Sequence, residues 1–309
     1  MKNKINNVNL SKTKNVLTVD YKKDKIILWL FLSPAFIFIL FANIYPICYT
    51  IFMSFFKYNK IIPGTVPVFI GISNYINIFK DVVIRESFLK TVYFVAATVI
   101  VEFIIGMLLA LLITVNLKAM QYLRGFFLIP LMMTPVVAGT LWRTMFDPMS
   151  GPINYFIKLF GFQNIDFLGN ASRALPSIMV VEIWQATPVV MFILAAGIQA
   201  LPIDIYKAAD VDGASKWQIF TKITLPLLKP VFFVALLLRI MDAFKVFDTI
   251  YTMTYGGPGR ATELISMLIY KQGLKYFDIG KASTLSVMFL IIIFLISINF
   301  LRNIQKKEL

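Results

Sequence analysis

The chain has 309 residues, of which 59% are hydrophobic and only 15% are charged, and its formal net charge is +14. Soluble domains are usually about 45–50% apolar and about 25% charged, so this composition excludes a soluble enzyme, a disordered protein and a secreted disulfide scaffold. The single cysteine, Cys48, excludes an internal disulfide and a thiolate metal site, and the absence of histidine removes the commonest metal ligand and catalytic base. We therefore expect an all-α integral membrane protein without a catalytic site, a metal site or a cofactor.

Both ends of the chain are basic. Residues 1–25 contain seven lysines against Asp20 and Asp24, and the tail over residues 302–309 carries Arg302, Lys306 and Lys307 against one glutamate. Cytoplasmic segments of membrane proteins carry an excess of Lys and Arg. We therefore expect both termini in the cytoplasm, flanking a membrane-spanning domain over residues 26–301.

Long uncharged stretches predict where the chain crosses the membrane. A crossing helix needs about 20 predominantly apolar residues. Five stretches come close to that length or exceed it, interrupted only by Glu102 and Glu182: residues 26–56, 91–117, 125–142, 174–203 and 282–301. The outer loops over residues 57–90, 147–173 and 254–281 contain turn-forming Pro and Gly, so we expect compact connections without β-sheet architecture.

Residues 230–255 predict one more crossing, the fifth in chain order, although they contain four charges. A central charge costs about 2.5–3.5 kcal/mol on insertion scales. However, Arg239, Asp242, Lys245 and Asp248 alternate in sign at intervals of three, which on a helix predicts that Arg239 pairs with Asp242 and Lys245 with Asp248. Paired charges that face other helices are tolerated in membranes, so we expect six crossings.

The cytoplasmic segment over residues 201–229 is predicted to form two short helices. Pro202 and Asp204 suit a helix start, and Asp212-Gly213 suits a turn after it. Ser215 is a candidate cap for the second helix. We expect Pro226 to end that helix, and Pro230 to start the next crossing.

Trp217 and Phe220 lie three residues apart in the second helix, so they are expected to share one face. An aromatic face on a charged cytoplasmic segment indicates a docking site for a protein partner.

This segment resembles the signature loop of permease subunits of bacterial ABC importers, which has an EAA triplet, three residues, a glycine, nine residues and Ile-x-Leu-Pro. The matching residues in this chain are Lys207-Ala208-Ala209, Asp212-Gly213, Ile223 and Leu225-Pro226. Further similarity to the sugar-importer (maltose and multiple-sugar) branch lies at residues 126–146, Trp184, Leu201-Pro202, Phe247-Asp248 and Gly256-Gly257-Pro258. At the triplet, Lys207 replaces the usual glutamate, which reverses the charge at a position that the resemblance associates with contact to the ATPase.

The resemblance implies a six-helix permease fold in a bacterial inner or plasma membrane. It implies three kinds of partner: a cytoplasmic ABC ATPase dimer, a second homologous permease and an extracytoplasmic solute-binding protein. The coupling residues that it implies are Lys207, Ala208, Ala209, Asp212, Gly213, Trp217, Phe220, Ile223, Leu225 and Pro226. The chain has no G-x-x-x-x-G-K-[ST] phosphate loop, so we expect a transport subunit and not an enzyme, with a separate protein hydrolysing ATP.

The middle of the fourth and fifth crossings is the candidate substrate site. At about 1.5 Å per residue, Glu182, Arg239 and Glu102 all fall near mid-depth in the membrane, where transporter sites commonly lie. The resemblance to sugar importers implies contacts from Glu182, Ile183, Gln185, Ala186, Val189, Arg239 and Asp242. A helix break at Ala186-Thr187-Pro188 is expected to free backbone carbonyls for the same purpose.

Several alternatives remain open at the level of the sequence. Arg239 and Asp242 suit a pocket or a purely structural ion pair. The expected cargo is a disaccharide, an oligosaccharide or a polyol, but an arginine also suits glycerol phosphate or another small polar solute. A self-sufficient channel or secondary transporter would use the buried charges as ion or proton relays, and an intramembrane enzyme is disfavoured by the missing histidine.

Overall fold

The structure is a computed structural model that describes residues 21–114 and 119–308. The chain divides into two units, Met1–Phe52 and Met53–Leu309. The first unit holds α1 (Tyr21–Ile39), the π-helical turn η1 (Leu40–Ile44) and all but the last residue of α2 (Tyr45–Met53), which follow one another without a gap. The stretch Leu28–Met53 is long and apolar enough to cross a membrane. Most of the basic segment predicted for residues 1–25 lies outside the described residues.

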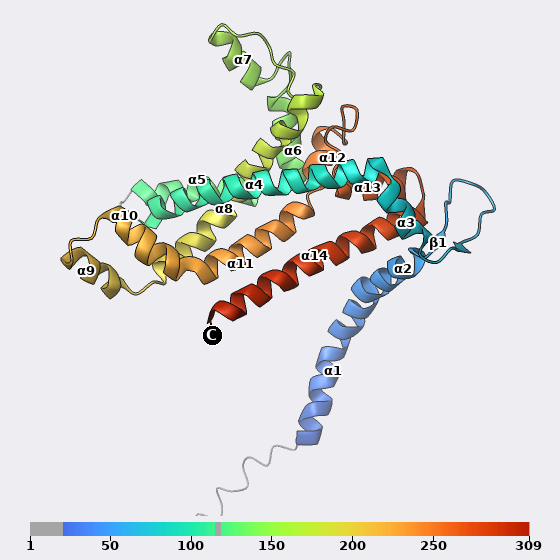
Figure 1. Ribbon diagram of the computed structural model, residues 1–309, viewed down its shortest axis with the longest axis horizontal. Coiled ribbons are helices and arrows are strands. Elements are labelled where there is room, and N and C mark those ends of the chain that lie inside the picture. Colours follow the sequence, from blue (N-terminus) through green and yellow to red (C-terminus); the bar gives the residue numbers. More distant parts are fainter. Residues whose placement is uncertain (1–20, 115–118, 309) are drawn as a thin grey trace, which may run out of the picture. The chain divides into compact units, whose positions relative to one another are not determined.

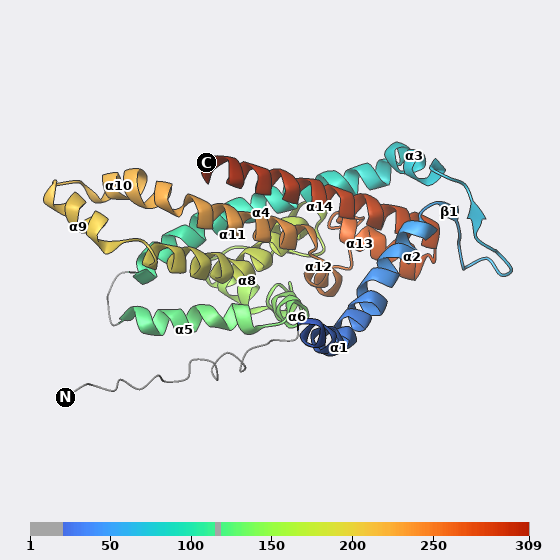
Figure 2. The same cartoon turned by 90° about the horizontal axis from the view of Figure 1, so that it is seen from below.

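Four long helices of the second unit lie side by side: α4 (Val82–Thr114), α8 (Ala171–Gln199), α11 (Leu225–Phe244) and α14 (Ile279–Glu308) (Figures 1 and 2). Small residues let α8 approach its neighbours closely. A Cβ atom added to Gly106 of α4 would lie 2.8 Å from Val190 of α8, and one added to Gly197 of α8 would lie 2.7 Å from Leu228 of α11. Close approach at small residues is the usual way in which helices associate in membranes, where apolar surface alone does not hold them together.

The third predicted crossing is not a straight helix. It is built from α5 (Ala119–Met132) and α6 (Pro135–Met145), which meet at an angle of 101°. Pro135 disfavours helical backbone at Thr134, and the side chain of Thr134 instead caps α6 by accepting a hydrogen bond from the N–H of Val137 at 3.4 Å. The described residues therefore contain five helices that are long enough to cross a membrane, or six spans if the bent pair is one span.

At one end of the four helices, the predicted pair of short helices is present as α9 (Ile203–Val211) and α10 (Lys216–Ile219) (Figure 1). The expectation that prolines end the second helix is wrong. From α10 the helix continues through the π-helical turn η2 (Phe220–Thr224) into α11, which contains both Pro226 and Pro230. The N–H of Leu225 bonds to the carbonyl of Phe220, five residues back, and this wider turn makes room for the proline ring that follows it.

The opposite end of the helices carries several short elements. They are β1 (Phe56–Lys57), β2 (Val68–Phe69), α3 (Ser73–Lys80), α7 (Pro152–Leu159), α12 (Asp248–Met253), α13 (Ile265–Tyr270) and the π-helical turn η3 (Lys271–Lys275). The antiparallel β1–β2 pair was not expected, because strands of two residues are too short to leave an alternating pattern in the sequence. These connections therefore contain several short elements and no separate sheet domain.

An ion pair at this end joins the start of α4 to the start of α14. Lys281 Nζ lies 2.8 Å from the carboxylate of Asp81. Partial burial raises the pKa of Asp81, but the hydrogen bond and the positive charge of Lys281 outweigh this effect, so the pKa lies below its ordinary value.

Candidate functional site

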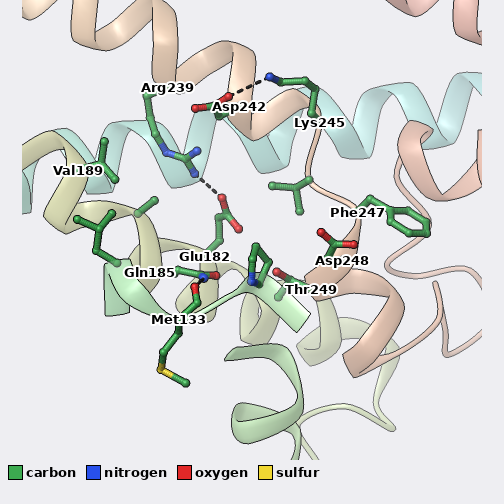
Figure 3. Close-up of a pocket in the computed structure, with 14 residues that line it drawn as sticks. Met133, Glu182, Gln185, Val189, Arg239, Asp242, Lys245, Phe247, Asp248 and Thr249 are labelled. Atoms are coloured by element: carbon green, nitrogen blue, oxygen red, sulfur yellow. Dashed lines mark hydrogen bonds and ion pairs between the residues drawn. The ribbon is translucent and has the colours of Figure 1, made fainter. Parts of the chain in front are cut away.

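A cavity of about 340 Å³ lies between α8, α11, the start of α12 and the bend between α5 and α6 (Figure 3). Six of the seven predicted substrate residues line it, and Ile183 does not. The lining residues are Leu131, Met133, Pro135, Glu182, Gln185, Ala186, Val189, Arg239, Asp242, Lys245, Val246, Phe247, Asp248 and Thr249.

A buried ionic triad lies at the edge of the cavity, and two of its members, Glu182 and Arg239, line it. Arg239 of α11 donates from Nε to Glu102 of α4 at 2.6 Å and from Nη2 to the same carboxylate at 3.0 Å. Nη2 also donates to Glu182 of α8. The three residues are almost fully buried, with Glu102 at 0%, Glu182 at 7% and Arg239 at 7% exposure. The triad therefore joins the three helices at the centre of the unit.

The predicted pairing of charges along the fifth crossing is wrong. Arg239 turns inward to the carboxylates of Glu102 on α4 and Glu182 on α8. Asp242 is more than half exposed and bonds instead to Lys245 at 3.0 Å (Figure 3). Asp248 does not pair with Lys245, because α11 ends at Phe244 and the three-residue spacing of a helix does not continue across the break to α12. Spacing along one helix could not reveal acids on two other helices.

Helix α8 lines the cavity with one face and has no break. It runs through Pro188 and ends at Gln199, so the predicted interruption at Ala186-Thr187-Pro188 is absent. The hydroxyl of Thr187 donates to the carbonyl of Ile183 at 2.6 Å, one turn earlier in the continuous helix. Gln185 donates from Nε2 to the carbonyl of Met133 at 2.9 Å and so ties α8 to the bend between α5 and α6.

The cavity residues that sequence reasoning missed come from two places. Residues 245–249 span the connection between α11 and α12 and the first turn of α12, and Phe247-Asp248 had already been noted for its resemblance to sugar importers. Leu131, Met133 and Pro135 come from the bend, for which the uncharged stretch gave no signal. Carboxylates, an amide, a hydroxyl and a guanidinium thus converge on one space beside apolar side chains such as Val189, an arrangement that suits a polar organic ligand.

The predicted coupling segment has the expected local structure. Gly213 follows α9 with φ +71°, a left-handed conformation that favours glycine. Ser215 caps α10 in a reciprocal arrangement with Gln218, whose N–H bonds to the serine hydroxyl at 3.3 Å and whose side chain accepts from the serine N–H at 2.8 Å. The hydroxyls of Tyr206 and Thr224 lie 3.0 Å apart and hold α9 against η2.

Most of the predicted coupling residues are exposed at this end of the helices. Trp217 is 72% exposed, and its ring lies 5.9 Å from that of Phe220, so the two share a face as predicted. Lys207 is exposed and pairs with Asp204 at 3.3 Å, one helical turn earlier. Ala208, Asp212, Gly213, Leu225 and Pro226 are also exposed, Phe220 and Ile223 are half-buried, and Ala209 is buried.

Comparison with known proteins identifies the family. The family described as "Binding-protein-dependent transport system inner membrane component" matches residues 26–308. The chain belongs to this family. It is therefore the permease component of a binding-protein-dependent ABC transporter and a multi-pass inner-membrane protein, and it is not itself the ATPase.

Individual relatives cover nearly the whole permease. The trehalose/maltose transport system permease protein MalF of Thermococcus litoralis is 34% identical over 89% of this chain and 92% of its own length. The sulfoquinovosyl glycerol transport system permease protein SmoG of Agrobacterium fabrum is 33% identical over 92% of each chain. In the crystal structure of a bacterial ABC transporter that imports the acidic polysaccharide alginate, one chain matches with a TM-score of 0.81 and 22% identity over 93% of this chain and 97% of that chain. This match confirms the predicted fold class.

Proposed function

We propose that the permease carries a sugar, namely a disaccharide, an oligosaccharide or a polyol, through the cavity beside the ionic triad. The observation that carries the proposal is the set of side chains around this space. Glu182 and Asp242 accept hydrogen bonds from hydroxyl groups, Gln185 can donate and accept, and Ala186 and Val189 offer apolar contact to the C–H faces of a sugar ring. Relatives named for trehalose/maltose and trehalose transport support the choice of cargo.

The proposed site is open on one side, which agrees with an assembly of two permeases. In this proposal, a second homologous permease completes the cavity, and an extracytoplasmic solute-binding protein delivers the sugar to it. Val189 is 36% exposed although it lines the cavity, and Asp242 and Lys245 are also more than half exposed. Such polar groups at the edge of a membrane cavity would be covered by a partner subunit or by water.

The proposed coupling segment comprises residues 201–229. The exposed face of Trp217 and the exposed start of α9 would dock into a cytoplasmic ABC ATPase dimer, and closure of that dimer would move α11 directly, because α10, η2 and α11 are continuous. This assignment makes the end with α9 and α10 cytoplasmic. It also agrees with cytoplasmic ends for the basic segment over residues 1–25 and the tail over residues 302–309, the orientation that we propose.

We expect Val189→Phe to lower sugar uptake. The larger side chain would occupy part of a cavity of about 340 Å³ without removing a charge or a hydrogen bond. The expected fall is on the order of tenfold, equivalent to about 1.4 kcal/mol of lost binding. The measurement is uptake of labelled trehalose and maltose by cells that express the complete transporter, with the amount of permease in the membrane determined in parallel.

Val180→Phe is the matched control, because Val180 is on the same helix, is 49% exposed and does not line the cavity. Its uptake should equal that of the unmodified permease. Equal uptake by both variants would refute the cavity as the sugar site. A complete transporter that imports no carbohydrate at all would refute the proposed cargo.

A further inference from the structure

The cavity and its triad contain more acidic than basic side chains. Within the described residues, four carboxyl groups lie in or directly behind the cavity wall, those of Glu102, Glu182, Asp242 and Asp248. Only two cations face them, Arg239 and Lys245. Protonation of one carboxyl group in the triad would still leave an excess of one carboxylate.

Arg239 is already engaged by its two carboxylates. Its Nε–H and its Nη2 group make the three hydrogen bonds to Glu102 and Glu182, which leaves only Nη1 to face a ligand. An anionic ligand would have to compete with two buried acids for this guanidinium. A neutral hydroxyl group could instead accept from Nη1 while the triad stays intact.

The second cation is also engaged, and one acid has no partner. Lys245 bonds to Asp242 at 3.0 Å. Asp248 is exposed at the start of α12, and no described residue forms an ion pair with it. Its carboxylate therefore gives this side of the cavity an uncompensated negative charge.

Building on the proposed sugar import, we propose that the cavity takes uncharged carbohydrates and that Asp248, together with the excess carboxylate around Arg239, excludes anionic ones. Family membership does not decide this point, because relatives and structural neighbours are named both for trehalose/maltose and for the acidic polysaccharide alginate. Like charges a few ångströms apart in a partly desolvated site repel each other enough to lower affinity by roughly 10- to 100-fold.

The test compares two ligands that differ by a single charge. The probes are trehalose and trehalose in which one primary CH₂OH group is oxidised to a carboxylate. Calorimetry would measure the dissociation constant of each for the complete permease–ATPase complex in lipid nanodiscs, without the solute-binding protein, at low and high salt. We expect the carboxylate derivative to bind at least tenfold more weakly than trehalose at low salt. The difference between the two dissociation constants should become smaller at high salt, because salt screens exposed charges.

Asp248→Asn should lower the ratio of the two dissociation constants, carboxylate over trehalose, by roughly tenfold. The control is Glu86→Gln, which removes an exposed acid of α4 that does not line the cavity and whose ion pair with Lys90 is long at 3.9 Å. Glu86→Gln should leave the ratio of the two dissociation constants unchanged.

The outcomes separate this inference from the proposed function. Equal or tighter binding of the carboxylate would overturn the exclusion of anions and leave sugar import standing. A ratio of dissociation constants that stays the same in Asp248→Asn would overturn the role of Asp248. If neither probe bound, and a panel of other uncharged sugars failed as well, the proposed function itself would fall.

Discussion

Arg239→Met is expected to prevent stable assembly of the permease. The substitution removes the only cation in the triad and leaves Glu102 and Glu182 buried opposite each other. Breaking a buried ion pair by removing one partner typically costs about 3–5 kcal/mol, because the remaining charge keeps its desolvation penalty. The measurement is the amount of folded permease recovered from membranes, together with its thermal unfolding in detergent, and we expect a severe loss of both.

Two further variants test the physical reason for this loss. The triple variant Glu102→Gln, Glu182→Gln, Arg239→Met removes all the charges at once, and it should recover most of the folded protein because no charge is left unpaired. Lys245→Met is the matched control. It breaks the pair with Asp242 on the same helix, but both side chains are more than half exposed, and exposed pairs contribute only about 0–1 kcal/mol. Folded Arg239→Met in normal amount would contradict a structural role of the triad.

This expectation changes how the sugar site has to be tested. Substitution of Arg239 cannot separate sugar binding from assembly, because its side chain joins three helices. Val189 is the better position, since it lines the cavity and makes no polar contact there. The ion pair between Arg239 and Asp242 that the sequence left open is not formed, because Arg239 bonds to Glu102 and Glu182 instead. Arg239 and Asp242 both line the cavity, so the pocket alternative stays a prediction.

The sequence predicted local features well because local chemistry determines them. The turn at Gly213 and the cap at Ser215 depend on residues only a few positions apart, so their patterns could be recognised directly. The positions of most crossings followed from the absence of charge. The level of Glu102, Glu182 and Arg239 followed from the rise of a helix, and the structure brings these three side chains together.

The features that were missed depend on contacts between distant segments. The partners of Arg239 lie 137 and 57 residues away, so spacing along its own helix favoured Asp242 instead. The 101° bend at Pro135 lies within an uncharged stretch, and the hydropathy of a stretch does not show whether its helix axis changes direction. Pro188 and Pro226 were expected to break or end helices, but in the structure α8 and α11 continue through them.

Trp217→Ala is expected to separate assembly of the permease from ATP-driven transport. The side chain is 72% exposed and packs on Phe220, so its removal should change the stability of the permease itself by no more than about 0.5 kcal/mol. If the ring is an anchor of the ATPase interface, its truncation should cost about 2 kcal/mol or more of association, a weakening of roughly 30-fold. The measurement is recovery of the ATPase with the tagged permease, alongside sugar uptake at equal permease levels.

Phe160→Ala provides the comparison for this prediction, because Phe160 is an aromatic residue that is 79% exposed and lies outside residues 201–229. Loss of the ATPase and of uptake in Trp217→Ala alone would assign the docking surface to the coupling segment. Equal recovery of the ATPase with both variants would place the docking surface elsewhere. In that case the continuity of α10, η2 and α11 would no longer explain how ATP hydrolysis changes the conformation around the cavity. The movement of the ATPase would have to be transmitted to the permease through a different helix.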